Sequence, residues 1–501
     1  MNTEVPTLGG QQMARRTARA VFWNYASFGL GKFLVFITTA ILARLLSPDD
    51  FGLVALATLA VNYLSVLKDL GLGDALIQRR DDIEEASNTV FTLNLILGVV
   101  LTLASVAIAP LVAAYFRQPL VIPLLRALGL TFAINALGSV HIVMLQRQLD
   151  FRRKLIPDIG RSVIKGVVSI GCALAGMGAW ALVIGQLAGV VIGVLIAWVV
   201  YPWRPRLLIN SKLAFGLLKF GMSLIVIQVF TVIEDNLDYL IIGRRFGEAP
   251  LGIYTLAYRL PEMLVISLLW VMASVIFPAY STVQDQPDIL RRGFLATIRF
   301  TEILAVPICL GLFLAADPIV RVVFGPQWLE TIPVLRVLAI FALFTSIGFN
   351  VGDVYKAVGR PDILVKLSIA YLSTLAPALI LGSNFGLVGV AFGHLTVSFI
   401  YMFVRIAVAT RFVKVNLWDI LGELKPSFLG GLVLSVLVIV SLYLTAGLAP
   451  LWQLLVAVAA GAGGYLGVLW LVERDTLLKV VRVLGISGPA GRESKALAEN
   501  Q

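Results

Sequence analysis

The sequence predicts an all-α polytopic membrane protein of about fourteen transmembrane helices. The helices are expected to form two parallel six-helix repeats, each a lobe, followed by two extra C-terminal helices. Three observations predict this fold: the composition, the length of the apolar blocks and an internal repeat. Apolar residues make up 59% of the 501 residues and charged residues only 14%. So few charges could not cover a soluble protein of this size.

The apolar residues fall into long blocks separated by short charged loops. A helix needs about 20 apolar residues to cross a bilayer, and the blocks have about this length. No loop between them is long enough for an independent domain. The predicted spans are residues 18–46, 51–74, 88–115, 119–145, 155–177, 179–201, 214–243, 250–277, 295–323, 331–355, 364–382, 385–409, 427–446 and 449–472.

The net charge of +11 orients these helices. Most lysines and arginines fall in predicted loops or tails on the side of the N-terminus, as the positive-inside rule requires of a cytoplasmic face. This asymmetry predicts an even number of spans with both termini in the cytoplasm, and it favours contact with anionic lipid over nucleic acid. The basic residues assigned to the opposite side are Arg44, Arg117, Arg244, Arg245 and Arg321.

The sequence also repeats itself with an offset of about 200 residues. Six helices per repeat is an even number, so both copies would enter the membrane from the same side and suit an alternating-access transporter. The matched segments are Ile41–Ala57 with Ile241–Ala257, Ile122–Leu128 with Ile332–Leu338, and Gly178–Leu187 with Gly386–Leu395. The expected organisation is a cytoplasmic segment at 1–17, an N-lobe at 18–203, a C-lobe at 204–411, two extra helices at 412–473 and a cytoplasmic tail at 474–501.

Charged residues inside the predicted spans are the candidate site residues, because a charge in hydrocarbon costs at least a few kcal/mol. Lys32 lies near the middle of the first span, where Asn24 contributes to the same polar face. In the seventh span, Asp235 and Asp238 lie on one helical stripe. These residues predict a polar cleft between the lobes.

The eighth span adds Arg259 and Glu262, one turn apart around Pro261, so the two can pair on one face. The alternative to a functional role is an internal ion pair that only fixes helix packing. Arg44 lies at a helix C-terminus, where anchoring to head groups and contact with a ligand are both open. Arg161 and Lys165 are expected to be interfacial, near the cytoplasmic end of their span.

Several classes of function are disfavoured by what the sequence lacks. It has no phosphate loop, nucleophile triad or metal-ligand spacing, so we expect neither an enzyme nor a bound cofactor. The two cysteines and the two histidines fall apart from one another inside predicted spans. A membrane glycosyltransferase or polymerase would need large non-cytoplasmic loops, which are missing.

The junction between the first two spans, Ala43–Gly52, resembles the R-L-L-x-P-x-x-F-G junction of bacterial polysaccharide transporters. Leu70–Gly73 and Ala357–Pro361 resemble loops of the same family, which belongs to the multidrug/oligosaccharidyl-lipid/polysaccharide flippase superfamily. The similarity is greatest to colanic-acid and O-antigen type exporters, and it extends over nearly the whole chain.

The resemblance implies an inner-membrane flippase that moves undecaprenyl-diphosphate-linked oligosaccharides to the outer leaflet. It makes Lys32, Arg44 and Arg259, with Asn24, the candidates for the diphosphate and sugars. Asp235, Asp238 and Glu262 become candidates for cavity polar groups or for coupling to H⁺ or Na⁺. Partners would be the lipid-linked oligosaccharide, membrane lipids and polysaccharide polymerase machinery. The alternative is a cation-coupled multidrug or amphiphile exporter of the same fold.

Overall fold

The computed structural model describes residues 29–68 and 71–474, and this part of the chain consists of helices and the loops between them, with no strand. A first helix runs over residues 29–45. The elements that follow are α2 Pro48–Ser65, α3 Leu72–Gln78, α4 Ile83–Phe116, α5 Val121–Arg147, α6 Phe151–Leu174, α7 Ala179–Val200, α8 Ser211–Phe246, α9 Glu248–Pro261, η1 Glu262–Ile266, α10 Ser267–Thr282, α11 Pro287–Leu314, α12 Ala316–Val323, η2 Pro326–Trp328, α13 Thr331–Phe349, α14 Val351–Ala357, α15 Asp362–Gly382, η3 Ser383–Phe385, α16 Gly386–Val413, α17 Leu417–Leu444 and α18 Pro450–Val472.

Every predicted span from residue 88 onward contains a helix, and the differences lie in where helices break. The predicted span at 51–74 is wrong as a continuous helix: α2 ends at Ser65, and α3 begins after Gly71, whose φ of 66° lies in the left-handed region. The predicted spans at 295–323 and 331–355 are each divided into two helices, at Ala315 and Asn350.

Nine helical segments within residues 29–68 and 71–474 are long and apolar enough to cross a membrane. Helix α6 is not among these segments, since even its more apolar half carries Asp158, Arg161 and Lys165. The count of fourteen spans and the six-plus-six repeat therefore stay predictions. Two of these charges of α6, Arg161 and Lys165, belong to the site described below.

The junction between the first helix and α2 shows why its motif has that sequence. Ser47 and Asp50 form a capping box: the Ser47 hydroxyl accepts from the Asp50 amide over 3.2 Å, and the Asp50 carboxylate accepts from the Ser47 amide over 3.0 Å. Pro48 occupies the first turn of α2, where its missing N–H has no helical partner to lose. The S-P-D-D part of the motif is thus a helix start.

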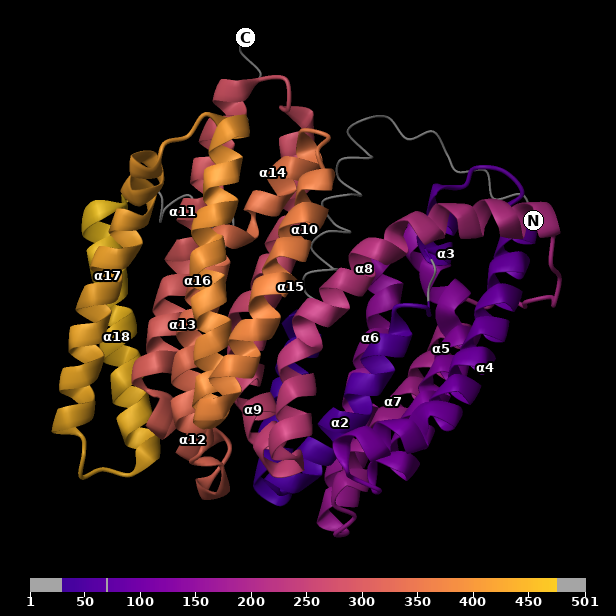
Figure 1. Ribbon diagram of the computed structural model, residues 1–501, viewed down its shortest axis with the longest axis horizontal. Coiled ribbons are helices and arrows are strands. Elements are labelled where there is room, and N and C mark those ends of the chain that lie inside the picture. Colours follow the sequence, from indigo (N-terminus) through magenta and orange to yellow (C-terminus); the bar gives the residue numbers. More distant parts are fainter. Residues whose placement is uncertain (1–28, 69–70, 475–501) are drawn as a thin grey trace, which may run out of the picture. The chain divides into compact units, whose positions relative to one another are not determined.

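The described residues form two compact units. The first contains the chain up to Arg259 together with residues 323–334 and 362–397. In it, α4 lies beside α5 and α6 beside α7 as antiparallel hairpins, drawn in indigo to purple in Figure 1. Small residues at the α6–α7 contact allow these two helices to approach closely, as membrane helices commonly do.

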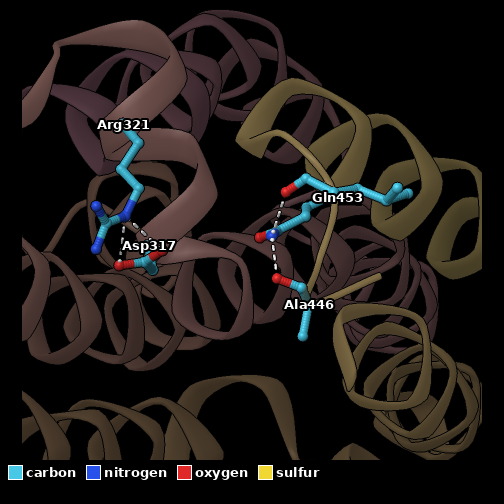
Figure 2. A network of polar contacts seen from close by, with 5 residues as sticks. Asp317, Arg321, Ala446 and Gln453 are labelled. Atoms are coloured by element: carbon cyan, nitrogen blue, oxygen red, sulfur yellow. Dashed lines mark hydrogen bonds and ion pairs between the residues drawn. The ribbon is translucent and has the colours of Figure 1, made fainter. Parts of the chain in front are cut away.

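The second unit contains residues 260–322 and 335–361 and the chain from Ser398 onward. Here α17 and α18 form a hairpin, drawn in orange to yellow in Figure 1, that packs against α11. The hairpin loop is held by Gln453, whose Nε2 donates to the carbonyl oxygens of Leu448 over 2.9 Å and Ala446 over 3.3 Å (Figure 2). Figure 2 also shows Arg321 paired with Asp317 across one turn of α12.

The boundary between the units falls in an irregular helix. After Pro261, residues Glu262–Ile266 form a π-helical turn before α10 resumes the α-helix. Proline removes a helical hydrogen bond, and π-turns accommodate an extra residue at such points. The sequence prediction that Pro261 loosens this helix is confirmed.

Candidate functional site

The site begins with the close packing of α6 on α7 in the first unit. Gly185, Gly189 and Gly193 lie four residues apart, so they share one face of α7. A Cβ on Gly189 would lie 2.8 Å from the carbonyl oxygen of Arg161 and 2.9 Å from the Cβ of Lys165. Only glycine fits there. The backbone of α6 is therefore pressed against α7 at the two turns that carry Arg161 and Lys165.

The charged ends of these two side chains meet other helices of the same unit. Nη1 of Arg161 donates to Oδ1 of Asn135 on α5 over 3.2 Å. Lys165 is half-buried and interacts electrostatically with both Arg161 and Arg259, the latter on α9. Within the described residues, no carboxylate lies within 4.0 Å of the Lys165 ammonium. Arg161, Lys165 and Arg259 form what we call the cation cluster.

The position of Lys165 is unfavourable by itself. Burial disfavours its charged form, and Arg161 and Arg259 repel it. The planar guanidinium of an arginine can bind two oxygens of an anion side by side, while a lysine ammonium acts as a point charge. The arrangement is therefore suited to bind a multiply charged anion such as a phosphate ester.

The predicted residue Arg259 thus lies in the cation cluster, whereas Arg161 and Lys165 were expected at the interface. Lys165 lies beyond the middle of α6, and its expected place at the interface stays a prediction. The signal in the sequence was available: Asp158, Arg161 and Lys165 share one face of α6 at i, i+3 and i+7. Lys154 pairs with Asp158 over 3.0 Å, and Asp158 also interacts electrostatically with Arg161, so this face of α6 carries more positive than negative charge.

Lys32 belongs to the helix at 29–45, which packs along α6. A Cβ on Gly166 would lie 2.5 Å from Oγ1 of Thr38, and further along both helices Leu42 and Ala173 share one apolar cluster. The two helices therefore run in the same direction. Lys32 lies six residues before Thr38, about 9 Å along the helix axis, which puts it level with the Arg161 turn of α6. Its side chain is half-buried.

The remaining candidate diphosphate ligands lie elsewhere. Arg44 is exposed in the last turn of the helix at 29–45. Arg44 is not among the residues whose contacts define the cation cluster. Asn24 lies outside the described residues.

Asp238 is the candidate acidic residue that the structure buries most completely, at 1% exposure. Its Oδ2 accepts from the Tyr254 hydroxyl over 2.8 Å and lies 3.5 Å from Nδ1 of His394. Its Oδ1 accepts from the backbone amide of Tyr239 over 2.9 Å. Residues of the first unit from α8, α9 and the first part of α16 therefore converge on one carboxyl group.

The predicted polar stripe of α8 is divided by this packing. Asp238 and Asn236 are buried, and Nδ2 of Asn62 on α2 donates to Oδ1 of Asn236 over 3.1 Å. Asp235 is exposed. Glu262 is half-buried in the π-helical turn and belongs to the second unit. Its predicted pairing with Arg259 stays a prediction.

Sequence reasoning missed one further acidic residue. Glu302 of α11 is fully buried in the second unit, although a glutamate inside the predicted span 295–323 was itself a signal by the rule applied to the other spans. No group of three or more potential metal ligands occurs in the described part of the chain.

Comparison with known proteins places these features in a family. Residues 41–333 match the model of the family described as polysaccharide biosynthesis protein. The chain is 27% identical to the lipopolysaccharide biosynthesis protein WzxC of Escherichia coli K12 over 371 residues, which cover 73% of this chain and 75% of the relative. It is 29% identical to the teichuronic acid biosynthesis protein TuaB of Bacillus subtilis over 304 residues, covering 60% of this chain and 63% of the relative.

Solved structures give the same fold. The lipid II flippase MurJ in an inward closed conformation superposes with a TM-score of 0.73 at 14% identity, covering 91% of this chain and all of the other. An inward-facing multidrug resistance MATE transporter superposes with a TM-score of 0.63 at 18% identity, covering 76% and 96%. This chain has the fold of these transporters and is a multi-pass membrane protein. Because the family model matches more than half of its length, the chain belongs to the family of polysaccharide biosynthesis proteins.

Proposed function

We propose that this protein is a flippase that moves lipid-linked oligosaccharide repeat units from the inner to the outer leaflet of the bacterial inner membrane. The lipid carrier would be undecaprenyl diphosphate, and the products would feed surface polysaccharide synthesis. The work is translocation by alternating access with no covalent change in the substrate, so the protein is not an enzyme. The distribution of lysine and arginine supports an orientation with both termini in the cytoplasm.

The observation that carries this proposal is the cation cluster of Arg161, Lys165 and Arg259. A diphosphate is the charged, invariant part of every lipid-linked sugar, whereas the sugars differ between polysaccharides. A bound diphosphate would offset the repulsion that Arg161 and Arg259 exert on Lys165. Hydrogen bonds from a guanidinium to phosphate oxygens are among the strong ones in proteins.

Each residue has a distinct role in this proposal. Lys165 and Arg259 would contact the diphosphate directly. Arg161 is held by the Asn135 amide, so its guanidinium would be fixed in place before the ligand arrives. Lys32, level with the same turn of α6, would attract the diphosphate from the cytoplasmic leaflet. Arg44, exposed at a helix end, would bind sugar or lipid head groups.

The driving ion would act on the acidic residues. Asp238 is buried beside Tyr254 and His394, so taking up H⁺ or Na⁺ there would remove a buried charge. A change in that charge alters the packing of α8, α9 and α16, since all three meet at Asp238. Asp235 and Glu262, which are more accessible, would face sugar hydroxyl groups.

A second candidate function is cation-coupled export of drugs or other amphiphiles, which the fold likeness to MATE transporters favours. A cluster of cations disfavours it for cationic drugs. The two functions predict different phenotypes, because only a flippase would cause lipid-linked sugars to build up when it fails.

The test uses a host strain that lacks its own flippase for a known repeat unit. The wild-type gene should restore surface polysaccharide, and Lys165→Met or Arg259→Gln should not, while lipid-linked units accumulate on the cytoplasmic leaflet. Lys154→Met is the matched control, since it removes a lysine of the same helix outside the cation cluster. Membrane levels of each variant are compared by immunoblot.

Normal export by both cluster variants would refute the assignment of the site. A normal lipid-linked pool with raised drug sensitivity would favour the second function.

A further inference from the structure

Glu302 lies in the middle of α11, in the second unit, far along the chain from every residue used above. Its side chain is fully buried, at 0% exposure. Side chains of the surrounding core are apolar, including Val265, Ile303 and Leu343. Within the described residues, no cation forms an ion pair with Glu302. A buried carboxylate without a countercharge is strongly disfavoured relative to its neutral form.

The hydrogen bonds around Glu302 indicate which form is present. Oγ of Ser346 lies 2.8 Å from Oε1 of Glu302 and 2.7 Å from the carbonyl oxygen of Leu343. A serine hydroxyl has one proton, and a carbonyl oxygen can only accept. If the Ser346 proton is donated to Leu343, the second short contact requires a proton on Glu302. A carboxylate would have to share the one Ser346 proton with Leu343, whereas a neutral carboxylic acid that donates to the Ser346 oxygen leaves that proton to Leu343.

A second pair of residues lies beside this one. Nδ2 of Asn350 donates to Oγ1 of Thr301 over 3.0 Å. Ser346 and Asn350 are four residues apart and so share a face, which meets the adjacent residues Thr301 and Glu302 of α11. Oε2 of Glu302 and Oδ1 of Asn350 are both buried acceptors without a hydrogen-bond donor. Two unsatisfied acceptors in one polar patch mark a place where a proton or a hydrated proton can bind.

The helix segment next to this patch is the irregular one. The π-helical turn Glu262–Ile266 packs on α11, and Val265 of that turn belongs to the same core cluster as Ile303, the neighbour of Glu302. Turns of π-helix interrupt the α-helical hydrogen bonds and occur at sites that move or bind. A rearrangement of this turn would open the core beside Glu302 to water.

Other ionisable groups lie on α11 and on the helices packed against it. Cys309 of α11 and Tyr465 of α18 interact with it electrostatically. Arg299, one turn before it, is paired with Glu423 of α17 and Glu473. The further ionisable groups on the elements packed against α11 include Asp419 and Lys425 of α17, Glu262 of η1 and Tyr280 of α10, and α14, which packs on α10, carries Asp353 and Lys356.

We propose that Glu302 is a proton-binding site of the second unit, protonated in this conformation and deprotonated when the π-helical turn moves during transport. The step is the release of one proton from the Glu302 carboxylic acid to water, which leaves a carboxylate. The link to transport rests on the proposed function, whereas the protonation state does not.

The first test measures that protonation state in the full-length protein in lipid nanodiscs by infrared spectroscopy. We expect a carbonyl band of a protonated carboxylic acid at neutral pH that disappears as the pH is raised and is absent in Glu302→Gln. If that variant is unstable, Ser346→Ala provides the assignment, because loss of its hydroxyl partner shifts the band. A band missing at neutral pH, or one that persists until the protein unfolds, would overturn the proposal.

The second test measures flipping of a lipid-linked oligosaccharide in proteoliposomes with an imposed pH gradient. Glu302→Gln mimics the neutral acid, so we expect it to fold normally. The factor by which the pH gradient accelerates flipping should be at least about tenfold smaller in this variant than in the wild type. Asp288→Asn, an exposed acid of the same helix, should retain it. Gradient dependence equal to wild type in Glu302→Gln would show that the buried acid is only structural. If the wild type flips nothing, the proposed function fails while the infrared result stands.

Discussion

Gly52 of α2 packs against α9, and Gly252 of α9 packs against α2. A Cβ on Gly52 would lie 1.8 Å from the carbonyl oxygen of Glu248, and a Cβ on Gly252 would lie 2.0 Å from the carbonyl oxygen of Pro48. These two glycines occupy matched positions of the internal sequence repeat. The final glycine of the R-L-L-x-P-x-x-F-G motif is therefore required by a close backbone contact within the first unit.

Replacing either glycine by alanine should destabilise the protein, because the clash is with backbone and neither helix can yield without moving its first turn. We expect Gly52→Ala and Gly252→Ala each to cost about 1–3 kcal/mol or more. The measurement is thermal unfolding in detergent. Gly171→Ala is the control, since a Cβ there would meet nothing within 4 Å. A Gly52→Ala protein as stable as this control would contradict the reciprocal contact.

A second contact ties the same junction to a distant part of the first unit. Nε1 of Trp328 donates to the carbonyl oxygen of Ala43 over 2.6 Å, and Nε2 of Gln327 donates to the same oxygen over 2.7 Å. The Trp328 ring also meets Phe51 edge to face, with centroids 5.3 Å apart. These bonds satisfy a carbonyl of the last helical turn, which has no partner within its own helix.

Trp328→Phe keeps most of the ring and removes only the N–H donor. We expect a loss of about 1 kcal/mol in stability, because Gln327 still serves the Ala43 carbonyl. The double change Trp328→Phe with Gln327→Leu should cost more than the sum of the two single changes, since it leaves that oxygen unsatisfied. Strictly additive losses in the unfolding temperature would show that the two donors act independently.

The sequence predicted the helices far better than the site. Helix ranges follow from the length of apolar runs, which is a local property, so α4, α5 and α18 lie close to their predicted ranges. The break between Ser65 and Leu72 was missed because an apolar run does not show where the backbone turns. Gly71, with its positive φ, precedes the start of α3 there.

The cation cluster was only partly predictable for a related reason. Which face of α6 meets the rest of the unit depends on the contact with Gly189 of α7, a long-range property. Arg259 was predicted from its burial in a span, but its electrostatic contact with Lys165 joins helices about 90 residues apart and leaves no periodic signal in either. Glu302 was missed although the same rule that selected Asp238 applies to it.

Lys165→Met should make the ligand-free protein more stable and the site weaker. Removing one of three like charges relieves repulsion and desolvation, a gain on the order of 1 kcal/mol, as is common when a functional residue is replaced. Affinity for a diphosphate lipid should fall about ten- to hundredfold, the range for losing one charge-assisted contact. Thermal unfolding without ligand and binding of a fluorescent undecaprenyl diphosphate measure the two effects.

The matched control for this prediction is again Lys154→Met. Its ammonium pairs with Asp158, so its loss should slightly lower stability and leave diphosphate binding near the wild-type value. The two lysines of α6 thus give opposite signs for stability. A Lys165→Met protein that is less stable and binds normally would mean that the cation cluster serves packing alone.

Asp238→Asn tests whether the buried carboxyl group of the first unit couples transport to an ion. Asparagine has nearly the same shape and can still accept from the Tyr254 hydroxyl, so the fold should persist. The lost property is the ability to change charge. We therefore expect flipping driven by an H⁺ or Na⁺ gradient to fall by about 5- to 150-fold, the usual range of a coupling free energy. Flipping without a gradient should change little.

Asp74→Asn, an exposed acid of α3 in the same unit, should behave as wild type in both assays. Equal loss in the presence and absence of a gradient would mean that Asp238 supports the packing of α8, α9 and α16 and takes no part in coupling.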